Sequence, residues 1–259
     1  MPDRHVTIIT YHAIDERKSV ISVKPSQFCR QMGLLKKQGI RGISLAMALD
    51  SPEQADEPRG SSVVLTFDDG YLSVLQNALP VMKTLGFTGT VFIPTNFVGL
   101  SGKQAQSQNA DINRDMMDWN HLEELADAGF EVAAHAKSHP DLTRLTPDQL
   151  EDEIGASKQC LENHLHQPVL SLAYPYGYYN TKVRQAADRH FRYGCTTELG
   201  HNKPGTDRLL LKRIDAYYLD RESTFLKASA GGLNTWWKFR QGMRQIKSLG
   251  RNLSKPFGE

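Results

Sequence analysis

The stretch Ser62-Val-Val-Leu-Thr-Phe-Asp-Asp-Gly70 predicts a buried strand that ends in two adjacent carboxylates. Residues 63–65 form a short apolar run rich in β-branched side chains, which is typical of a strand covered on both faces. Asp68 and Asp69 follow at its C-terminal end, where side chains of neighbouring residues point in different directions. One carboxylate can therefore hold a metal ion while the other faces a substrate. A plain turn is the alternative, because Asp-Asp-Gly is also common turn chemistry.

Predicted strands alternate with predicted helices on both sides of this stretch. Strands or short extended elements are expected at residues 6–11, 40–45, 62–67, 90–93, 130–134, 169–173, 193–197 and 209–214. Helices are expected at residues 26–37, 71–85, 114–128, 146–164 and 181–189, with a kink at Pro80 in the second. Residues 50–60 and 99–113 are expected to be loops. Such alternation is typical of a parallel sheet, and six or seven units favour a closed or nearly closed barrel.

Several polar side chains fall at or just past the ends of the predicted strands. In barrels of this kind the chemistry gathers at the C-terminal ends of the strands. The residues that fall there are His12, Asp68, Asp69, His135, His139 and Tyr176. We therefore expect them to share one edge of the barrel.

The composition argues against several functional classes. The chain has 259 residues and a net charge of only +2, which does not favour nucleic acid as a partner. Its three cysteines are scattered, which favours a reducing compartment over a disulfide framework. The first residues lack the apolar core of a signal peptide, and no run approaches the roughly 20 apolar residues of a membrane span. A cytoplasmic location is therefore expected.

A second motif, His135-Ala-Lys-Ser-His139-Pro, follows the strand predicted at 130–134. Two histidines four residues apart are able to bind one metal ion if they share a face. The Asp-Asp strand end supplies a carboxylate as a third ligand. Two imidazoles and one carboxylate leave positions open for water or substrate, as catalytic metal sites do. The same ligands also suit an iron-dependent oxygenase, although such an enzyme needs no adjacent base.

Three motifs in this order resemble the polysaccharide deacetylases with a NodB-type domain, similar to carbohydrate esterase family 4. The motifs are Thr66-Phe-Asp-Asp-Gly70, His135-x-x-Ser-His139-Pro and Tyr174-Pro-Tyr-Gly177. The similarity extends over about residues 5–215. It implies an irregular (β/α)7 barrel, in agreement with the alternation above. It also implies a hydrolase of non-peptide amide bonds that deacetylates sugars of a bacterial exopolysaccharide or cell envelope.

The resemblance also assigns roles to residues. Asp69, His135 and His139 would bind a divalent metal ion, with zinc as the first choice and cobalt, nickel or iron as alternatives. Asp68 would be the general base that takes a proton from the attacking water. The backbone N–H of Tyr176 would help to hold the oxyanion.

Four residues are candidates for contact with the substrate, namely His12, Tyr174, Pro175 and Tyr176. Ordinary packing is the alternative for Tyr174, and a surface or core position is the alternative for His12. The chain departs from the family at Ala173, where many members carry an Arg that orients the base. Arg213 is a candidate substitute. The late family motifs that supply the general acid are not evident, so no residue is assigned that role.

Residues 226–259 are expected to form a basic amphipathic helical tail, separate from a catalytic barrel at 1–225. Apolar residues recur every three or four positions from Trp236 to Leu253. Residues 235–259 contain six basic side chains and one acid. A helix of this kind suits peripheral contact with a membrane surface. It suits equally a helix that packs on the barrel and leaves its basic face in water.

Three classes of function follow. The first is metal-dependent removal of an N-acetyl group from a glycan, which is either a polysaccharide or a lipid-linked sugar at the inner face of a membrane. A deformylase, or another amide hydrolase acting on a lipid-linked sugar, is an alternative with the same chemistry. The second class is the iron-dependent oxygenase. The third is a non-catalytic glycan-binding module of the same fold, which Ala173 and the missing late motifs favour.

Overall fold

The computed structural model describes residues 5–50, 62–109 and 112–253, and the side chains of residues 245–253 are outside that description. The loop predicted at 50–60 lies outside the described residues, apart from its first residue. Residues 110 and 111 of the second predicted loop also lie outside them.

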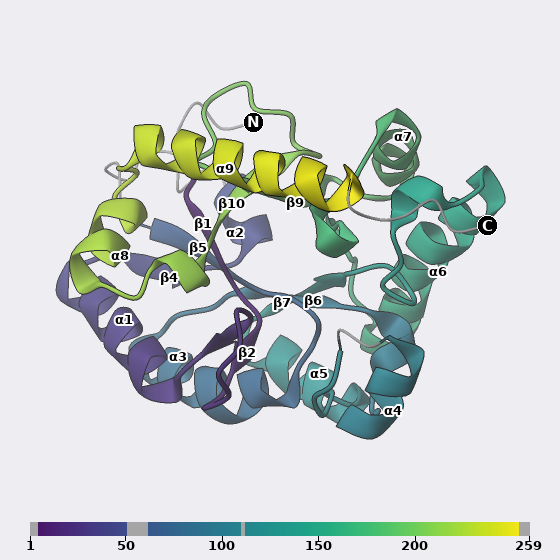
Figure 1. Ribbon diagram of the computed structural model, residues 1–259. Helices are drawn as coiled ribbons and strands as arrows, with labels where there is room; N and C mark the ends of the chain where they lie inside the picture. Colours follow the sequence, from purple (N-terminus) through teal and green to yellow (C-terminus); the bar gives the residue numbers. More distant parts are fainter. Residues whose placement is uncertain (1–4, 51–61, 110–111, 254–259) are drawn as a thin grey trace.

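Within the described residues, seven parallel strands close into a barrel that helices surround (Figure 1). The strands run around the barrel as β1 (Ile8–Tyr11), β10 (Leu211–Asp215), β9 (Tyr193–Leu199), β8 (Ser171–Ala173), β7 (Glu131–Ala134), β6 (Thr90–Ile93) and β5 (Ser62–Phe67). β5 then pairs with β1 and closes the ring. A further strand, β4 (Arg41–Ile43), pairs with the first half of β5. The predicted irregular (β/α)7 barrel is confirmed.

Alternate residues of each strand point into the barrel, because successive side chains of a strand face opposite ways. One buried cluster inside the barrel includes Ile8, Val64, Phe92, Ala133 and Leu211. Their neighbours Ile9 and Leu65 belong instead to the larger apolar cluster that includes the helices. Asp68 lies four residues after Val64, and Arg213 lies two after Leu211. Both therefore follow the inward face of their strands, above the apolar layer.

Helices surround the barrel. They are α1 (Pro25–Lys37), α2 (Leu45–Asp50), α3 (Leu79–Leu85), α5 (Trp119–Asp127), α6 (Pro147–Leu165) and α7 (Thr181–His190). Of these, α1, α6 and α7 agree closely with the predicted helices. The helix predicted at 71–85, with a kink or break at Pro80, changes from a π-helical turn at Val74–Ala78 to α3 just before Pro80. Pro80 then occupies the first turn of α3, where a missing N–H costs nothing.

Two predictions about local structure were wrong. The loop predicted at 99–113 contains α4 (Gly102–Gln108), which begins with a capping box between Ser101 and Gln104. This helix lacks an apolar stripe, and Ala105 is its only buried residue, so its sequence gives no periodic signal. The helix predicted at 114–128 begins only at Trp119, because the Asp118 side chain caps it by accepting from the backbone N–H of His121. Strands β2 (Ala13–Ile14) and β3 (Ser22–Val23) and helix α2 were not predicted.

The chain ends in α8 (Glu222–Ser229) and α9 (Asn234–Leu253), and α9 lies across β9 and β10 (Figure 1). Trp237 of α9 is 1% exposed. The Gln241 side chain accepts from the N–H of Leu199, and Arg244 donates to the carbonyl of Thr197. The described half of α9 therefore packs on the barrel, and contact of the tail with a membrane is not supported. No helix in the described part of the chain has the length and apolarity to cross a membrane.

Candidate active site

Asp69, His135 and His139 come together at the C-terminal ends of β5 and β7. The Nε2 atoms of both histidines lie 3.5 Å from Oδ1 of Asp69. All three side chains are buried, and their candidate ligand atoms lie within 4.8 Å of one another. Two imidazole nitrogens and one carboxylate oxygen in such a cluster are a donor set that fits a divalent metal ion such as zinc.

A hydrogen bond to the backbone fixes the ring orientation of His135. Its Nδ1 donates a hydrogen bond to the carbonyl oxygen of Ala173, at 2.7 Å. Its Nε2, on the other side of the ring, therefore faces Asp69, which is the usual orientation of a histidine that binds a metal. Ala173, where the sequence departs from the family, thus contributes its backbone to the site.

The backbone is strained where it carries these groups. Asp69, Ala136, His139 and Tyr176 all have positive φ, between 55° and 73°. Residues with a side chain rarely adopt this left-handed region, and each instance costs about 1 kcal/mol or more. Strain of this kind persists only where the surrounding structure imposes it, and it concentrates at functional sites.

Asp68 points into the barrel, where it forms a bidentate ion pair with Arg213. Both guanidinium–carboxylate distances are 2.7 Å, and the Arg213 side chain is 1% exposed. The guanidinium also donates to the carbonyl oxygen of Thr196 and lies over the ring of Phe92. The contact predicted between Arg213 and Asp68 is therefore present.

The charges of the site keep both aspartates ionised. Burial alone would raise the pKa of Asp68, but the positive charge of Arg213 outweighs it, and the pKa lies below its usual value. Burial opposes ionisation of Asp69 too, yet the neighbouring imidazoles His135 and His139 lower its pKa. Burial lowers the pKa of His139 to about 4, so this imidazole is neutral at pH 7 and has a free lone pair.

The four substrate candidates occupy different positions. His12 follows β1 and is half-buried, and its Nε2 is 3.9 Å from Oδ2 of Asp68. The Tyr176 ring is half-buried and packs edge-on against His139, with ring centroids 4.6 Å apart. Pro175 is buried beneath it. Tyr174 is completely buried in the apolar core, so its side chain offers no surface to a substrate.

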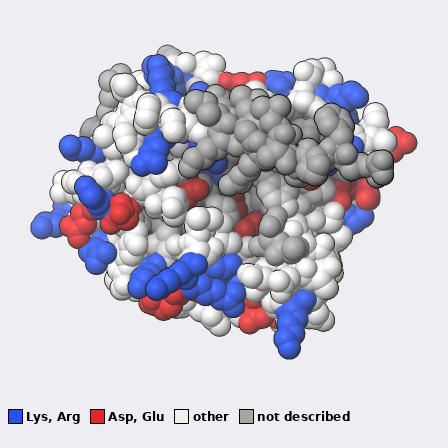
Figure 2. Space-filling model, in the orientation of Figure 1, with Lys and Arg blue, Asp and Glu red and all other residues white. Residues whose placement is uncertain are grey.

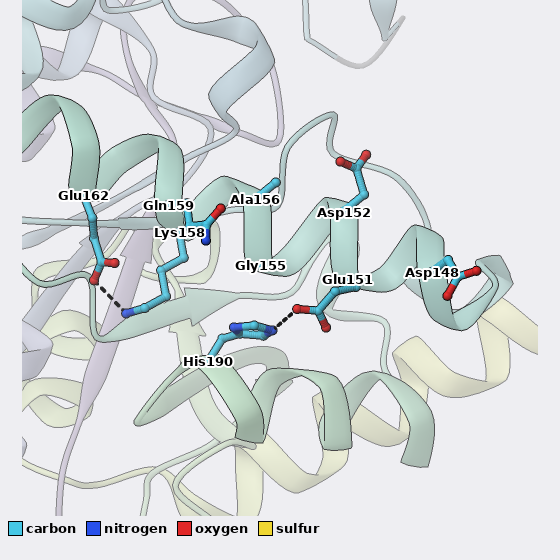
Figure 3. A pocket seen from close by; sticks show the side chains of 9 residues that line it. All are labelled: Asp148, Glu151, Asp152, Gly155, Ala156, Lys158, Gln159, Glu162 and His190. Atoms are coloured by element: carbon cyan, nitrogen blue, oxygen red, sulfur yellow. Dashed lines mark ion pairs between the residues drawn. The ribbon is translucent and has the colours of Figure 1, made fainter.

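The histidines late in the chain lie away from the site. His190 lies in a hollow between α6 and α7, where its Nε2 is 2.6 Å from Oε1 of Glu151 (Figure 3). His201 contacts the Thr7 hydroxyl through Nδ1 and the carbonyl of Gly232 through Nε2. Neither residue reaches Asp68, so neither is the missing general acid.

Two residues that support the site were not predicted. Glu153 of α6 accepts from the backbone N–H groups of Lys137 and Ser138 and from the Ser138 hydroxyl, at 2.6–2.9 Å. It thereby holds the loop between the two histidines. Asn109 lies 3.3 Å from Nδ1 of His139 and 3.2 Å from the Tyr176 hydroxyl. Glu153 and Asn109 both lie in stretches with the polar pattern of an ordinary protein surface. The capping box predicts the helix that carries Glu153, but no sequence signal predicts the position of Asn109.

Charged side chains are unevenly distributed on the face of the molecule that Figure 2 shows. In the space-filling view, acidic groups are recessed in a hollow near the centre, and basic side chains lie mostly around it (Figure 2). A hollow with ionised carboxylates at its base suits a cation together with a neutral, polar substrate.

Comparison with known sequences now identifies the family. The sequence profile of the family described as polysaccharide deacetylase matches residues 55–192, which is more than half of the chain. The chain belongs to the polysaccharide deacetylase family. The predicted resemblance and the predicted class of hydrolase are therefore confirmed at the level of the family.

Individual members of the family agree with this assignment. YxkH of Bacillus subtilis is 30% identical over 74% of this chain and 64% of its own length. The poly-β-1,6-N-acetyl-D-glucosamine N-deacetylase of Staphylococcus epidermidis is 24% identical over 74% of this chain and 67% of its own. The chain thus spans about two thirds of the length of these relatives. The Streptococcus pyogenes deacetylase PplD, solved with acetate, is 26% identical, with a TM-score of 0.71 over 82% of this chain and 92% of that one.

Proposed function

We propose that this chain is a metal-dependent N-deacetylase that hydrolyses acetamide groups of a glycan built from N-acetylglucosamine. The observation that carries the proposal is the pair of adjacent aspartates in different settings. Asp68 is held by Arg213 at 2.7 Å, and Asp69 lies 3.5 Å from two histidines. A relative that acts on poly-β-1,6-N-acetyl-D-glucosamine and another solved with acetate support this substrate class.

Asp69, His135 and His139 are the residues that would hold the metal ion. The ion, when bound, supplies a positive charge that polarises the acetamide carbonyl and lowers the pKa of a nearby water. Zinc is our first choice, because its preferred ligands are these imidazole nitrogens and a carboxylate, and cobalt, nickel and iron are alternatives. The hydrogen bond from His135 Nδ1 to the carbonyl oxygen of Ala173 holds this imidazole in place before the ion arrives.

Asp68 acts as the general base in this proposal. It accepts a proton from water while the water oxygen forms a bond to the carbonyl carbon. The negative charge that develops on the carbonyl oxygen is stabilised by the backbone N–H of Tyr176, as the family resemblance suggests. The C–N bond then breaks, the amine nitrogen takes a proton, and acetate and a free amino sugar leave.

His12 is our candidate for the donor of that last proton. It is half-buried at the end of β1, and its Nε2 lies 3.9 Å from the Asp68 carboxylate. A histidine is suited to donate a proton near neutral pH. His190 and His201 make their contacts elsewhere, with Glu151 and with Thr7 and Gly232, so they are not candidates for this role.

The test is acetate release from β-1,6-linked and β-1,4-linked N-acetylglucosamine oligomers and from N-formyl and lipid-linked N-acetyl sugars. Wild type is compared with Asp68→Asn, which keeps the size of the side chain and removes the base. We expect acetate from one of the oligomers and a loss of at least a hundredfold in the variant. Release of formate alone would favour the deformylase, and an equal rate in the variant would contradict the proposal. No product from any substrate would favour the non-catalytic module.

A further inference from the structure

A cavity of about 760 Å³ has walls that lie outside the residues that the family profile matches. The walls come from β3, from the start of α1, from the turn η6 (Ala216–Tyr218) that follows β10, from the first turn of α8 and from the first two turns of α9. The volume lies within the range of about 300–1,000 Å³ that is typical of small-molecule sites.

Three aromatic side chains line one wall of this cavity. Tyr217 is 53% exposed, and its ring meets that of Tyr218 edge-on at 5.3 Å. Tyr218 in turn meets Trp236 of α9 edge-on at 6.1 Å. The Arg240 guanidinium lies over both, 5.3 Å from the Tyr218 ring and 4.9 Å from the Trp236 ring. These contacts fix the orientation of the rings, and fixed aromatic faces suit the apolar C–H faces of a sugar ring.

The same cavity is also lined by polar groups that the fold does not use. The side chains of Gln27, Asp220 and Thr224 line the cavity and form no hydrogen bond or ion pair with any other described residue. An amide, a carboxylate and a hydroxyl are suitable partners for sugar hydroxyl groups. A lining of aromatic side chains with a few polar groups is the usual composition of a specific ligand site.

The position of the cavity connects it to the candidate catalytic base. Thr10 of β1 pairs with Asp215 of β10, and the two strands are parallel. His12 and Tyr217, each two residues beyond this pair, therefore leave the barrel at the same edge. His12 lies 3.9 Å from Asp68. A chain of sugars that presents its acetamide to Asp68 is thus able to continue past His12 into the cavity.

We propose that this cavity, walled by Tyr217, Tyr218 and Trp236, is a subsite for a further sugar unit of the glycan that is deacetylated at Asp68. The inference rests on the proposed function, and it specifies a polymeric substrate rather than a single sugar. Contacts beyond the reacting unit raise kcat/KM for long chains, because their binding energy is absent for short ones.

The test compares a β-1,6-linked N-acetylglucosamine hexamer with the dimer, using the full chain. We expect wild type to show the higher kcat/KM on the hexamer. Tyr217→Ala and Trp236→Ala are each expected to lower the ratio of hexamer to dimer kcat/KM about fivefold, as loss of one stacking contact implies. Phe239→Ala is the control, because Phe239 is an aromatic residue of α9 that is 65% exposed and lies outside the cavity. It should leave the ratio unchanged.

Binding is also measured by calorimetry in the absence of turnover, with the hexamer added to Asp68→Asn alone and to the double variant with Tyr217→Ala. A fivefold weaker affinity in the double variant than in Asp68→Asn supports the subsite. If wild type releases no acetate but this difference in affinity is found, the proposed function is wrong and the sugar-binding subsite stands. Acetate release with equal ratios in wild type, Tyr217→Ala and Trp236→Ala would overturn the subsite and leave the proposed function standing. Tyr217 is largely exposed, so its removal does not threaten folding.

Discussion

Arg213 and Asp68 form a buried ion pair, and the charge of Arg213 lowers the pKa of Asp68. The guanidinium lies inside the barrel and contacts both carboxylate oxygens. A buried charge is costly to leave alone, and removal of one partner from such a pair typically destabilises a protein by about 3–5 kcal/mol. The pair therefore serves to keep Asp68 ionised at a place where burial alone would protonate it.

We predict that Arg213→Met shifts the pH dependence of deacetylation. Asp68 must be ionised to accept a proton, and in wild type its lowered pKa keeps it so at every pH near neutrality. Without the guanidinium, burial raises the pKa above its ordinary value of about 3.9, so activity is lost as the pH falls through a higher value. The profile of kcat/KM against pH should show an acid limb moved to higher pH, with partial recovery of the rate in alkali.

Arg213→Lys is the matched control for that profile. Lysine keeps the positive charge and loses the bidentate geometry, so the acid limb should move less than in Arg213→Met. An acid limb that stays in place in both variants would show that Arg213 does not set the ionisation of Asp68.

The site residues that the sequence could predict are those that belong to compact motifs. Asp68, Asp69, His135 and His139 stand at strand ends, and each motif places its ligands within a few residues. Arg213 was predicted because Ala173 left the base without a partner. Glu153 and Asn109 reach the site from a helix face and a helix end. Nothing in a polar pattern distinguishes a side chain that meets a loop from one that meets water.

At the scale of elements, helix α6 positions the loop that joins the two histidines. The Glu153 carboxylate accepts three hydrogen bonds from that loop, two of them from backbone N–H groups. Ala136 and His139 in this loop have positive φ. The bonds from α6 offset the tendency of the loop to relax, so a residue outside the candidate metal-binding group determines where His139 lies.

We predict that Glu153→Ala weakens metal binding about 10- to 100-fold, as is typical when the residues that support metal ligands are lost. The affinity is measured by competition with a chromophoric chelator. Asp152→Asn is the matched control, because Asp152 is the neighbouring residue on the same helix and pairs with the ammonium group of Lys137 and not with the loop backbone. Equal affinities in the two variants would show that the loop keeps its shape without α6.

Elements with a strong apolar period or a capping box before an apolar helix were predictable, whereas short or wholly polar elements that depend on tertiary contacts were not. Strands β5, β6 and β7 have runs of buried residues, and α6 carries a complete capping box. Helix α4 is polar throughout, and β2 and β3 have two residues each. Elements this short depend on the contacts that the barrel offers them, and no local pattern records those contacts.

At the scale of the whole molecule, the C-terminal helix is part of the barrel assembly. The predicted boundary between residues 225 and 226 falls within α8, and α9 bonds to the end of β9 through Gln241 and Arg244. An amphipathic pattern shows that one face of a helix is covered, but it does not show by what. The sequence therefore left a membrane and the barrel as equal alternatives.

We predict that Trp237→Ala lowers the free energy of unfolding by about 3–5 kcal/mol, because it empties a site in a well-packed core. In a chain of this length that loss corresponds to a fall in Tm of roughly 6–20 °C. Phe239→Ala, two residues along the same helix, removes an exposed ring and should change Tm by no more than a degree or two. Similar Tm values for the two variants would mean that α9 does not pack on the barrel.

The central claim is that Asp69, His135 and His139 hold the metal ion with which Asp68 acts. The most direct measurement is a titration of zinc into chelator-treated protein, with acetate release from N-acetylglucosamine oligomers recorded at each addition. We predict that activity is lost with the chelator, returns in proportion to added zinc, and levels off at one equivalent per chain. His139→Ala should show no such saturation. Full activity after removal of the metal, or an unchanged titration in His139→Ala, would contradict the account.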